Sequence, residues 1–260
     1  MSYLGIDIGT TGCKAVAFSE AGEQIALAYR DYPVTSPQAG RAELDPKLVM
    51  DRCFEVIHEA AAACASDPVQ SLGVSSQGEA FTPVGPDGEL LANAMVSSDA
   101  RAAQIASDWS RDFGAERLYQ ITGHTPAAIF TLFKLLWLRD NQPEVWNRAR
   151  AFYCFEDLLH WRLGIEPAMS WPLAGRTMLF DVRKHEWSPE ILDAVGLDAG
   201  KLARPLASGE VVGTIPAGVA RELGLPDGVR VVAGGHDQTC GALGAGVVAP
   251  GRAVYGMGTV

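Results

Sequence analysis

The alternation of apolar and polar positions at the start of the chain predicts three consecutive β-strands. Two apolar runs, Tyr3 to Ile8 and Cys13 to Phe18, are joined by a short segment rich in glycine and threonine, which is typical of a tight turn. A second turn, Glu20 to Glu23, leads into a third apolar-rich stretch, Gln24 to Val34. The opening element is therefore expected to be three successive antiparallel strands.

A helix is predicted soon after these strands. Asp45 and Pro46 form the pairing of a side-chain cap followed by proline at the first helical position. The apolar residues that follow recur at helical spacing, so one amphipathic helix is expected from Asp45 to about Ala65.

Strands and helices alternate along the rest of the chain. Further strands are expected at Val69 to Ser75, Ala80 to Val84, Leu90 to Leu91, Val229 to Ala233 and Arg252 to Met257. Further helices are expected at Ala100 to Phe113, Ala127 to Arg139, Glu156 to Leu163, Pro216 to Leu223 and Thr239 to Gly246. The small residues of the last helix indicate close packing against another element. The pattern predicts a mixed α/β fold, and no linker divides residues 1–260.

Composition narrows the classes of function. The chain has 21 Lys and Arg against 31 Asp and Glu, a net charge of −10, which disfavours a nucleic-acid or anionic-membrane partner. Its hydrophobic fraction of 48% predicts a packed core. Five cysteines without metal-binding spacing, and a start without signal-peptide character, favour the reducing cytoplasm. No run is long and apolar enough for a membrane span.

The turn between the first two strands has the side chains of a phosphate-binding loop. Glycines let an incoming group approach the backbone N–H groups, hydroxyls and an ammonium add donors, and a carboxylate suits hydrated Mg²⁺. These residues are Asp7, Gly9, Thr10, Thr11, Gly12 and Lys14. The alternative is a plain hairpin with a polar turn. No helix follows directly, so this is not a Walker sequence.

A second candidate lies at the end of a predicted buried strand near the C-terminal end of the sequence. Two glycines, Gly234 and Gly235, precede Asp237, which then opens a helix of small residues. A carboxylate in this position can accept a hydroxyl proton as the oxygen attacks phosphorus. The alternative is that Asp237 only caps the helix.

A third group of polar residues lies at the ends of apolar runs. Amide, carboxylate and guanidinium groups provide the paired hydrogen bonds that a polyhydroxylated ligand needs. The group comprises Gln77, Gly78, Glu79, Asp99 and Arg101. The alternative is structural, with Asp99 capping the helix that begins at Ala100 and Arg101 paired with a nearby acid.

Other residues with chemical potential are interpreted as structural. His124, His160 and His185 are isolated in the sequence and are assigned to surface or core positions. Glu156 and Asp157 open a helix, where acidic side chains suit the dipole. The tryptophans are expected to pack in the core, with Trp171 a candidate for lining a pocket.

Taken together, these segments resemble the N-terminal domain of the FGGY family of carbohydrate kinases. The resemblance runs in order along the whole chain, through YLGIDIGTTGCKA, LDP, LGVSSQGEA, SSDAR, KLLWL, RTMLFDVRKHEWS and GGHDQTCGALGAG. It implies a ribonuclease H-like (actin-like ATPase) fold with a mixed sheet, antiparallel opening strands and flanking helices. It also implies that residues 1–260 form the N-terminal domain and that a C-terminal nucleotide-binding domain is absent from this chain.

The resemblance assigns roles by position. ATP and Mg²⁺ contacts fall on Asp7, Gly9, Thr10, Thr11 and Lys14, with Asp7 beside the metal. The catalytic base falls on Asp237, and contacts to a small carbohydrate fall on Gln77, Gly78, Glu79, Asp99 and Arg101. Three departures from the family pattern leave the substrate open. They are Gly78-Glu79 after the glutamine, Ser97 in place of a common tryptophan, and a residue near Ser170 that is not acidic.

The leading expectation is ATP-dependent phosphorylation of a hydroxyl on a ketose, polyol or sugar acid, with little activity from this domain alone. One alternative is a sugar-sensing module that lacks turnover. Another is a two-metal nuclease using Asp7, Glu79, Asp99 and Asp237, which the charge of −10 disfavours. A homodimer is compatible with the sequence, which does not fix the oligomeric state.

Overall fold

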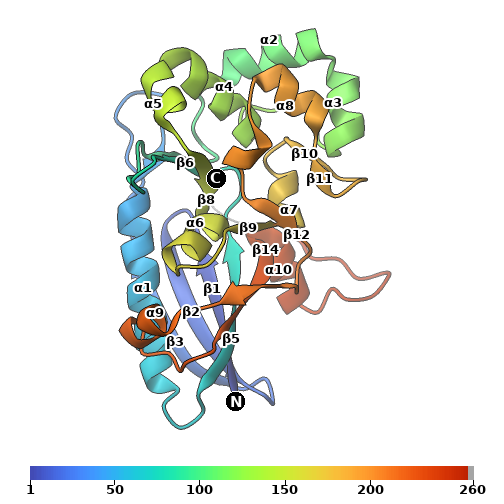
Figure 1. Ribbon diagram of the computed structural model, residues 1–260. Helices are drawn as coiled ribbons and strands as arrows, with labels where there is room; N and C mark the ends of the chain where they lie inside the picture. Colours follow the sequence, from blue (N-terminus) through green and yellow to red (C-terminus); the bar gives the residue numbers. More distant parts are fainter. Residues whose placement is uncertain (257–260) are drawn as a thin grey trace.

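A six-stranded mixed sheet forms the centre of the computed structural model, which describes residues 1–256 (Figure 1). The strand order is β13-β14-β5-β1-β2-β3. The strands are β1 (Ser2–Ile8), β2 (Gly12–Ser19), β3 (Gln24–Asp31), β5 (Val69–Ser76), β13 (Val211–Thr214) and β14 (Arg230–His236). The first three are antiparallel neighbours, as predicted, while β5 runs parallel to both β1 and β14. The third strand ends at Asp31, three residues before the predicted end.

Helix α1 (Pro46–Ala63) covers one face of this sheet (Figure 1). The Asp45 carboxylate accepts hydrogen bonds from the backbone N–H groups of Lys47, at 2.9 Å, and Leu48, at 3.3 Å, and Pro46 occupies the first turn. The predicted cap is therefore confirmed. Buried residues of α1 recur at helical spacing and pack on the alternate, buried residues of β1 and β2.

The segment between β5 and β14 contains most of the helices, and four two-stranded pairs lie outside the central sheet (Figure 1). The helices are α2 (Ala103–Phe113), α3 (Ala115–Thr122), α4 (Thr131–Asn141), α5 (Pro143–Arg148), α6 (Phe155–Arg162), α7 (Trp171–Gly175), α8 (Pro189–Val195), η1 (Ala199–Lys201) and α9 (Ala217–Glu222). The pairs are β4 (Glu43–Leu44) with β7 (Ala94–Met95), β6 (Phe81–Val84) with β8 (Ala151–Cys154), β9 (Ala168–Ser170) with β12 (Arg204–Leu206), and β10 (Phe180–Asp181) with β11 (Glu186–Trp187). Helix α10 (Asp237–Gly244) follows β14.

Two clusters of buried apolar side chains fill the interior. One lies between the central sheet, α1 and α6, and the other gathers around α4, which is buried on nearly every side as its apolar sequence predicts. Tyr153 of β8 packs against both clusters. No helix within residues 1–256 is both long and apolar enough to cross a bilayer.

Several predicted boundaries are wrong. Leu90 makes only an isolated bridge to Val84, so Leu90–Leu91 is not a strand. No strand forms over 252–256, and Met257 lies outside the described residues. Helices α2 and α4 begin three and four residues later than predicted, because their leading residues form turns fixed by side-chain and backbone hydrogen bonds. Helix α10 covers Asp237–Gly244, two residues earlier at each end than predicted. It contacts β14 near Gly235, although none of its residues is buried within the described chain.

Candidate active site

Three of the predicted segments meet at one edge of the central sheet. Strands β1, β5 and β14 are parallel neighbours, and Asp7 of β1 and Gly235 of β14 both pair with Ser75 of β5. The loops that leave the three strands therefore emerge side by side. The first is the loop from Gly9 to Thr11 (the glycine–threonine loop), the second is Gln77 to Glu79, and the third begins with Asp237. Segments more than 200 residues apart in the sequence thus share one surface.

The side chains of Tyr32 and Gln77 hold the glycine–threonine loop in place. The Tyr32 hydroxyl donates a 2.7 Å hydrogen bond to the carbonyl oxygen of Gly9, and the Gln77 amide donates one of 2.9 Å to the same oxygen. The Gln77 carbonyl in turn accepts a 3.2 Å hydrogen bond from the Thr10 hydroxyl. The backbone N–H groups of Thr10 and Thr11 have no acceptor within residues 1–256, so both can serve an anionic ligand.

Asp7 is a half-buried carboxylate beside this loop. It lies directly opposite Lys14 in the β1–β2 register, and Lys14 Nζ is 3.0 Å from one carboxylate oxygen. The other oxygen accepts a 2.9 Å hydrogen bond from the Ser75 hydroxyl. No group of three or more candidate metal-ligating side chains occurs in the described part of the chain. A single carboxylate suits Mg²⁺ that is bound mainly by phosphate oxygens and water. The N–H groups of the adjacent loop can bind the same phosphate.

Asp237 begins α10 immediately beyond the tip of β14. Its side chain is 31% exposed, and one carboxylate oxygen lies 3.3 Å from Nε2 of His236 and accepts a 2.7 Å hydrogen bond from the N–H of Gln238. Burial lowers the pKa of the His236 imidazole, although the neighbouring Asp237 charge opposes that shift. The second carboxylate oxygen has no partner within the described residues, so it remains free to accept a proton.

Glu79 is buried near His236, whose pKa its charge affects, and has a left-handed backbone conformation with φ of 66°. One carboxylate oxygen pairs with the guanidinium of Arg176, and the other accepts a 2.9 Å hydrogen bond from the Ser97 hydroxyl. The backbone carbonyl of Glu79 accepts a 3.0 Å hydrogen bond from Thr131. Lys134 lies 3.5 Å from the same carbonyl, and burial lowers the pKa of its ammonium to about 8. Two side chains of helix α4 therefore hold the backbone of Glu79 in its uncommon left-handed conformation.

Asp99 and Arg101 form a buried structural pair. The Asp99 carboxylate accepts hydrogen bonds from the Arg101 side chain, at 2.6 and 2.8 Å, and from the backbone N–H of Ala42, at 2.8 Å. Arg101 also lies 2.5 Å from Glu43 and covers the ring of Trp137. These groups are paired with protein partners, as in the structural alternative that the sequence left open, although Asp99 precedes α2 by too far to cap it.

Two members of the site were missed in the sequence. Arg176 follows α7 and pairs with Glu79, and His124 lies near enough to Arg176 and Glu79 for their charges to affect its pKa, which burial lowers. The backbone at Gly78 approaches both His236 and Arg176, because an added Cβ would lie 3.0 Å and 3.2 Å from their side chains. Glu79 lies 97 residues before Arg176, so the sequence contains no local pattern that predicts their pairing.

Replacing Arg176 with methionine is expected to lower the free energy of unfolding by about 2 kcal/mol, because the buried Glu79 carboxylate loses its partner. Adding Glu79→Gln should recover part of the loss. Lys184→Met is the control, since Lys184 is 65% exposed and its ion pairs contribute little. Urea unfolding of the three variants measures the effect. Equal losses for Arg176→Met and Lys184→Met would contradict a stabilising Arg176–Glu79 pair.

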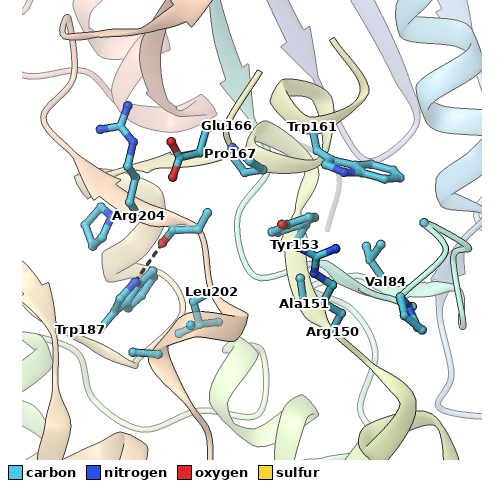
Figure 2. A pocket seen from close by; sticks show the side chains of 17 residues that line it. Val84, Arg150, Ala151, Tyr153, Trp161, Glu166, Pro167, Trp187, Leu202 and Arg204 are labelled. Carbon is cyan, nitrogen blue, oxygen red and sulfur yellow. Dashed lines mark hydrogen bonds between the residues drawn. The ribbon is translucent and has the colours of Figure 1, made fainter. Parts of the chain in front are cut away.

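A separate cavity of about 700 Å³ lies between α6, β8, η1 and β12 (Figure 2). Its walls include Tyr153, Trp161 and Trp187, and the Trp187 indole donates a 2.9 Å hydrogen bond to the carbonyl of Ala203. None of the residues predicted for phosphate, sugar or base lines it. Trp171 is also absent from this cavity and stacks on His185 with ring centroids 3.8 Å apart.

Comparison with known proteins identifies relatives for almost the whole chain. Xylulose kinase of Bacillus subtilis (strain 168) is 28% identical over 262 residues, covering 100% of this chain and 52% of that protein. L-fuculokinase of Escherichia coli (strain K12) is 28% identical over 251 residues, covering 94% and 52%. A ligand-bound xylulose kinase structure from Lactobacillus acidophilus superposes with a TM-score of 0.89 at 26% identity, covering 94% of this chain and 50% of that one.

The chain spans about half the length of the curated relatives it matches. The structural similarity confirms the predicted ribonuclease H-like, actin-like ATPase fold, with its mixed sheet and flanking helices. Residues 2–244 match the family model for the N-terminal domain of FGGY carbohydrate kinases. The chain therefore belongs to the FGGY family of carbohydrate kinases.

Proposed function

We propose that this chain is the sugar-binding and base-carrying half of a kinase that transfers the γ-phosphoryl group of ATP to a hydroxyl of a small carbohydrate. The observation that carries the proposal is the meeting of three loops at the carboxyl ends of β1, β5 and β14. Phosphoryl transfer needs a phosphate cradle, a hydroxyl-binding surface and a base within reach of one another. Each of the three loops supplies one of these.

Asp237 is proposed as the general base. Its free carboxylate oxygen takes the proton of the sugar hydroxyl while that oxygen attacks the γ-phosphorus. The His236 imidazole beside it, with a pKa lowered by burial, is neutral near pH 7 and so leaves the Asp237 charge available. The hydrogen bond from the Gln238 N–H orients the carboxylate without occupying its second oxygen.

The glycine–threonine loop is proposed to hold the ATP phosphates. The N–H groups of Thr10 and Thr11, which have no partner within residues 1–256, and the ammonium of Lys14 are the donors. Asp7 holds Mg²⁺ through water or directly. Bound Mg²⁺ would offset the charge that develops on the transferred phosphoryl group. Gln77 acts here by bracing the loop, because both ends of its amide are already bonded to it.

The sugar is proposed to bind over Gly78 and Glu79, next to His236 and Arg176. Close packing at Gly78 leaves room for little beyond hydrogen there, and Arg176 and Ser97 fix the Glu79 carboxylate. Asp99 and Arg101 then support the sugar site indirectly. Asp99 accepts a hydrogen bond from Ala42 and so holds the 40–42 loop, and Ser97, two residues before Asp99, bonds to Glu79. The proposed substrates are ketoses, polyols or sugar acids, and the named relatives act on xylulose and fuculose by their titles.

The two-metal nuclease has weaker support. Glu79 and Asp99 are committed to Arg176 and Arg101, and the described residues contain no cluster of three metal-ligating side chains. The net charge of −10 also opposes a polyanionic substrate.

The complete protein, assayed with Mg²⁺-ATP and a panel of pentuloses, hexuloses, polyols and aldonates, is expected to release ADP at least about 100-fold faster with one sugar than without sugar. Coupled ADP detection measures the rate, and phosphorylated product is confirmed by mass. A protein that binds a sugar, as shown by a raised melting temperature, but forms no ADP with any of them would instead be the sugar-sensing module.

A further inference from the structure

Glu156 is a fully buried carboxylate that links two parts of the proposed active site. It is the second residue of α6, with no exposed side-chain surface. One carboxylate oxygen accepts a 2.7 Å hydrogen bond from the backbone N–H of Ser170, and the other accepts one of 2.9 Å from the N–H of Gly234. No charged side chain pairs with it within residues 1–256, so its hydrogen-bond capacity is directed at these two amides.

The Gly234 amide needs this acceptor because β14 is irregular at that point. Val232 pairs with Gly73 and Gly235 pairs with Ser75, so two residues of β14 lie opposite the single residue Val74. A bulge of this kind leaves a backbone N–H without its partner in the sheet. Glu156 supplies the missing acceptor, and a buried amide without one costs free energy.

The two amides belong to segments that carry opposite sides of the proposed site. Gly234 is three residues before Asp237, and the bulge determines how the end of β14 presents that residue. Ser170 directly precedes α7, whose C-terminal residue is followed by Arg176, the partner of Glu79. The α7 residue Pro172 lies against Gly235, so the two segments are in contact close to Glu156. The two hydrogen bonds that Glu156 accepts, from Ser170 and Gly234, are called the Glu156 clamp below.

We propose that Glu156 is a positioning residue that sets the placement of Asp237 relative to the Arg176–Glu79 pair by holding the Gly234 and Ser170 amides together. This inference rests on the proposed kinase function. Glu156 has no access to substrate and acts only through the two backbone segments. The interpretation of Glu156 as an acid that suits the helix dipole is therefore incomplete, because its bonded partners lie 14 and 78 residues away.

The clamp is expected to depend on protonation. Burial raises the pKa of Glu156 to about 7, and only the ionised carboxylate accepts from both amides without a proton in the way. The ionisable groups around it are Asp157 and His160 on α6 and Cys240 on α10, and Arg204 on β12 lies near His160. Burial raises the pKa of Asp157 and lowers the pKa of His160 to about 4, so the His160 imidazole does not change charge near pH 7.

Glu156→Gln in the complete enzyme tests the proposal, because glutamine matches the size of glutamate but has only one accepting oxygen. The kcat for sugar phosphorylation is expected to fall about 10- to 100-fold, with the KM for ATP changed less than about threefold. In the unmodified enzyme, kcat is expected to rise as the pH is raised through 7, because Glu156 ionises over that range, and this rise should disappear in the variant. Hydrogen exchange at the Gly234 or Ser170 amide should accelerate at least about tenfold.

Glu144→Gln is the matched control, since Glu144 is also the second residue of a helix but is exposed. Glu144→Gln should leave the kinetic constants, the pH dependence of kcat and the hydrogen exchange of both amides unchanged. If Glu156→Gln fails to fold, hydrogen exchange of the unmodified protein at pH 6 and pH 8, corrected for intrinsic rates, replaces it and should show weaker protection of Gly234 at pH 6.

An unchanged kcat and pH profile with accelerated exchange would overturn the positioning role. Unchanged exchange would overturn the clamp itself. A wild-type enzyme without phosphoryl transfer would contradict the proposed function, a result that the exchange measurements tell apart from failure of the clamp.

Discussion

Replacing Asp237 with asparagine in the complete enzyme is expected to lower kcat for sugar phosphorylation about 10³-fold, the contribution of a well-placed general base. Asparagine keeps the size of the side chain and can keep the hydrogen bond from Gln238, but it cannot take a proton. The KM values for ATP and sugar should change little, because the phosphate loop and Glu79 remain. Steady-state kinetics with coupled ADP detection measures both parameters.

Asp227→Asn is the matched control for this experiment. Asp227 is exposed in the turn before β14, whereas Asp237 follows the other end of that strand, so the control makes the same chemical change away from the site. It should retain wild-type kcat. A kcat for Asp237→Asn within about tenfold of wild type would remove Asp237 from the base role, and a loss confined to KM would make it a binding residue.

Gly234→Ala is expected to lower the free energy of unfolding by about 4 kcal/mol, at the upper end for single substitutions. A Cβ at this position would lie 1.9 Å from the carbonyl oxygen and 2.5 Å from the carbonyl carbon of Val74. These are backbone atoms of the neighbouring central strand, so no side chain can rotate away to make room. The bulge must move, and with it the residues that lead to Asp237.

Gly218→Ala separates this clash from the general effect of removing a glycine. Gly218 lies in α9 with no atom within 4 Å of an added Cβ, so alanine there should raise stability by about 0.5–1 kcal/mol. Urea unfolding with an unchanged m-value compares the two. Similar stabilities for both variants would show that β14 accommodates a side chain at the bulge.

Local signals in the sequence predicted the parts of the site that depend on neighbouring residues. The turn around Gly9, the cap at Asp45 and the placement of Asp237 at a strand tip all follow from spacing over a few positions. The six-stranded sheet brings these parts together through parallel pairing that short-range patterns do not encode. The resemblance to a family supplied that arrangement in advance.

The supporting interactions could not be predicted in the same way. Arg176 pairs with a carboxylate 97 residues away, and Glu156 bonds to an amide 78 residues away. The late start of α2 has the same origin, because Asp99 bonds to Arg101 and to the distant Ala42 N–H. In each case the tertiary environment, which is absent from any local window, decided the role of a polar side chain.

The order in which the central sheet is assembled from the chain has a consequence for folding. Strands β1, β2, β3 and β5 are all complete by Ser76, whereas β14, the second neighbour of β5, begins only at Arg230. During synthesis, one edge of β5 remains without a hydrogen-bonded partner strand while the intervening helices are made. Closing so long a loop is slow, which makes β14 docking the expected rate-limiting step and the waiting strand an aggregation risk. Chaperone dependence would then be greatest for chains arrested before residue 230.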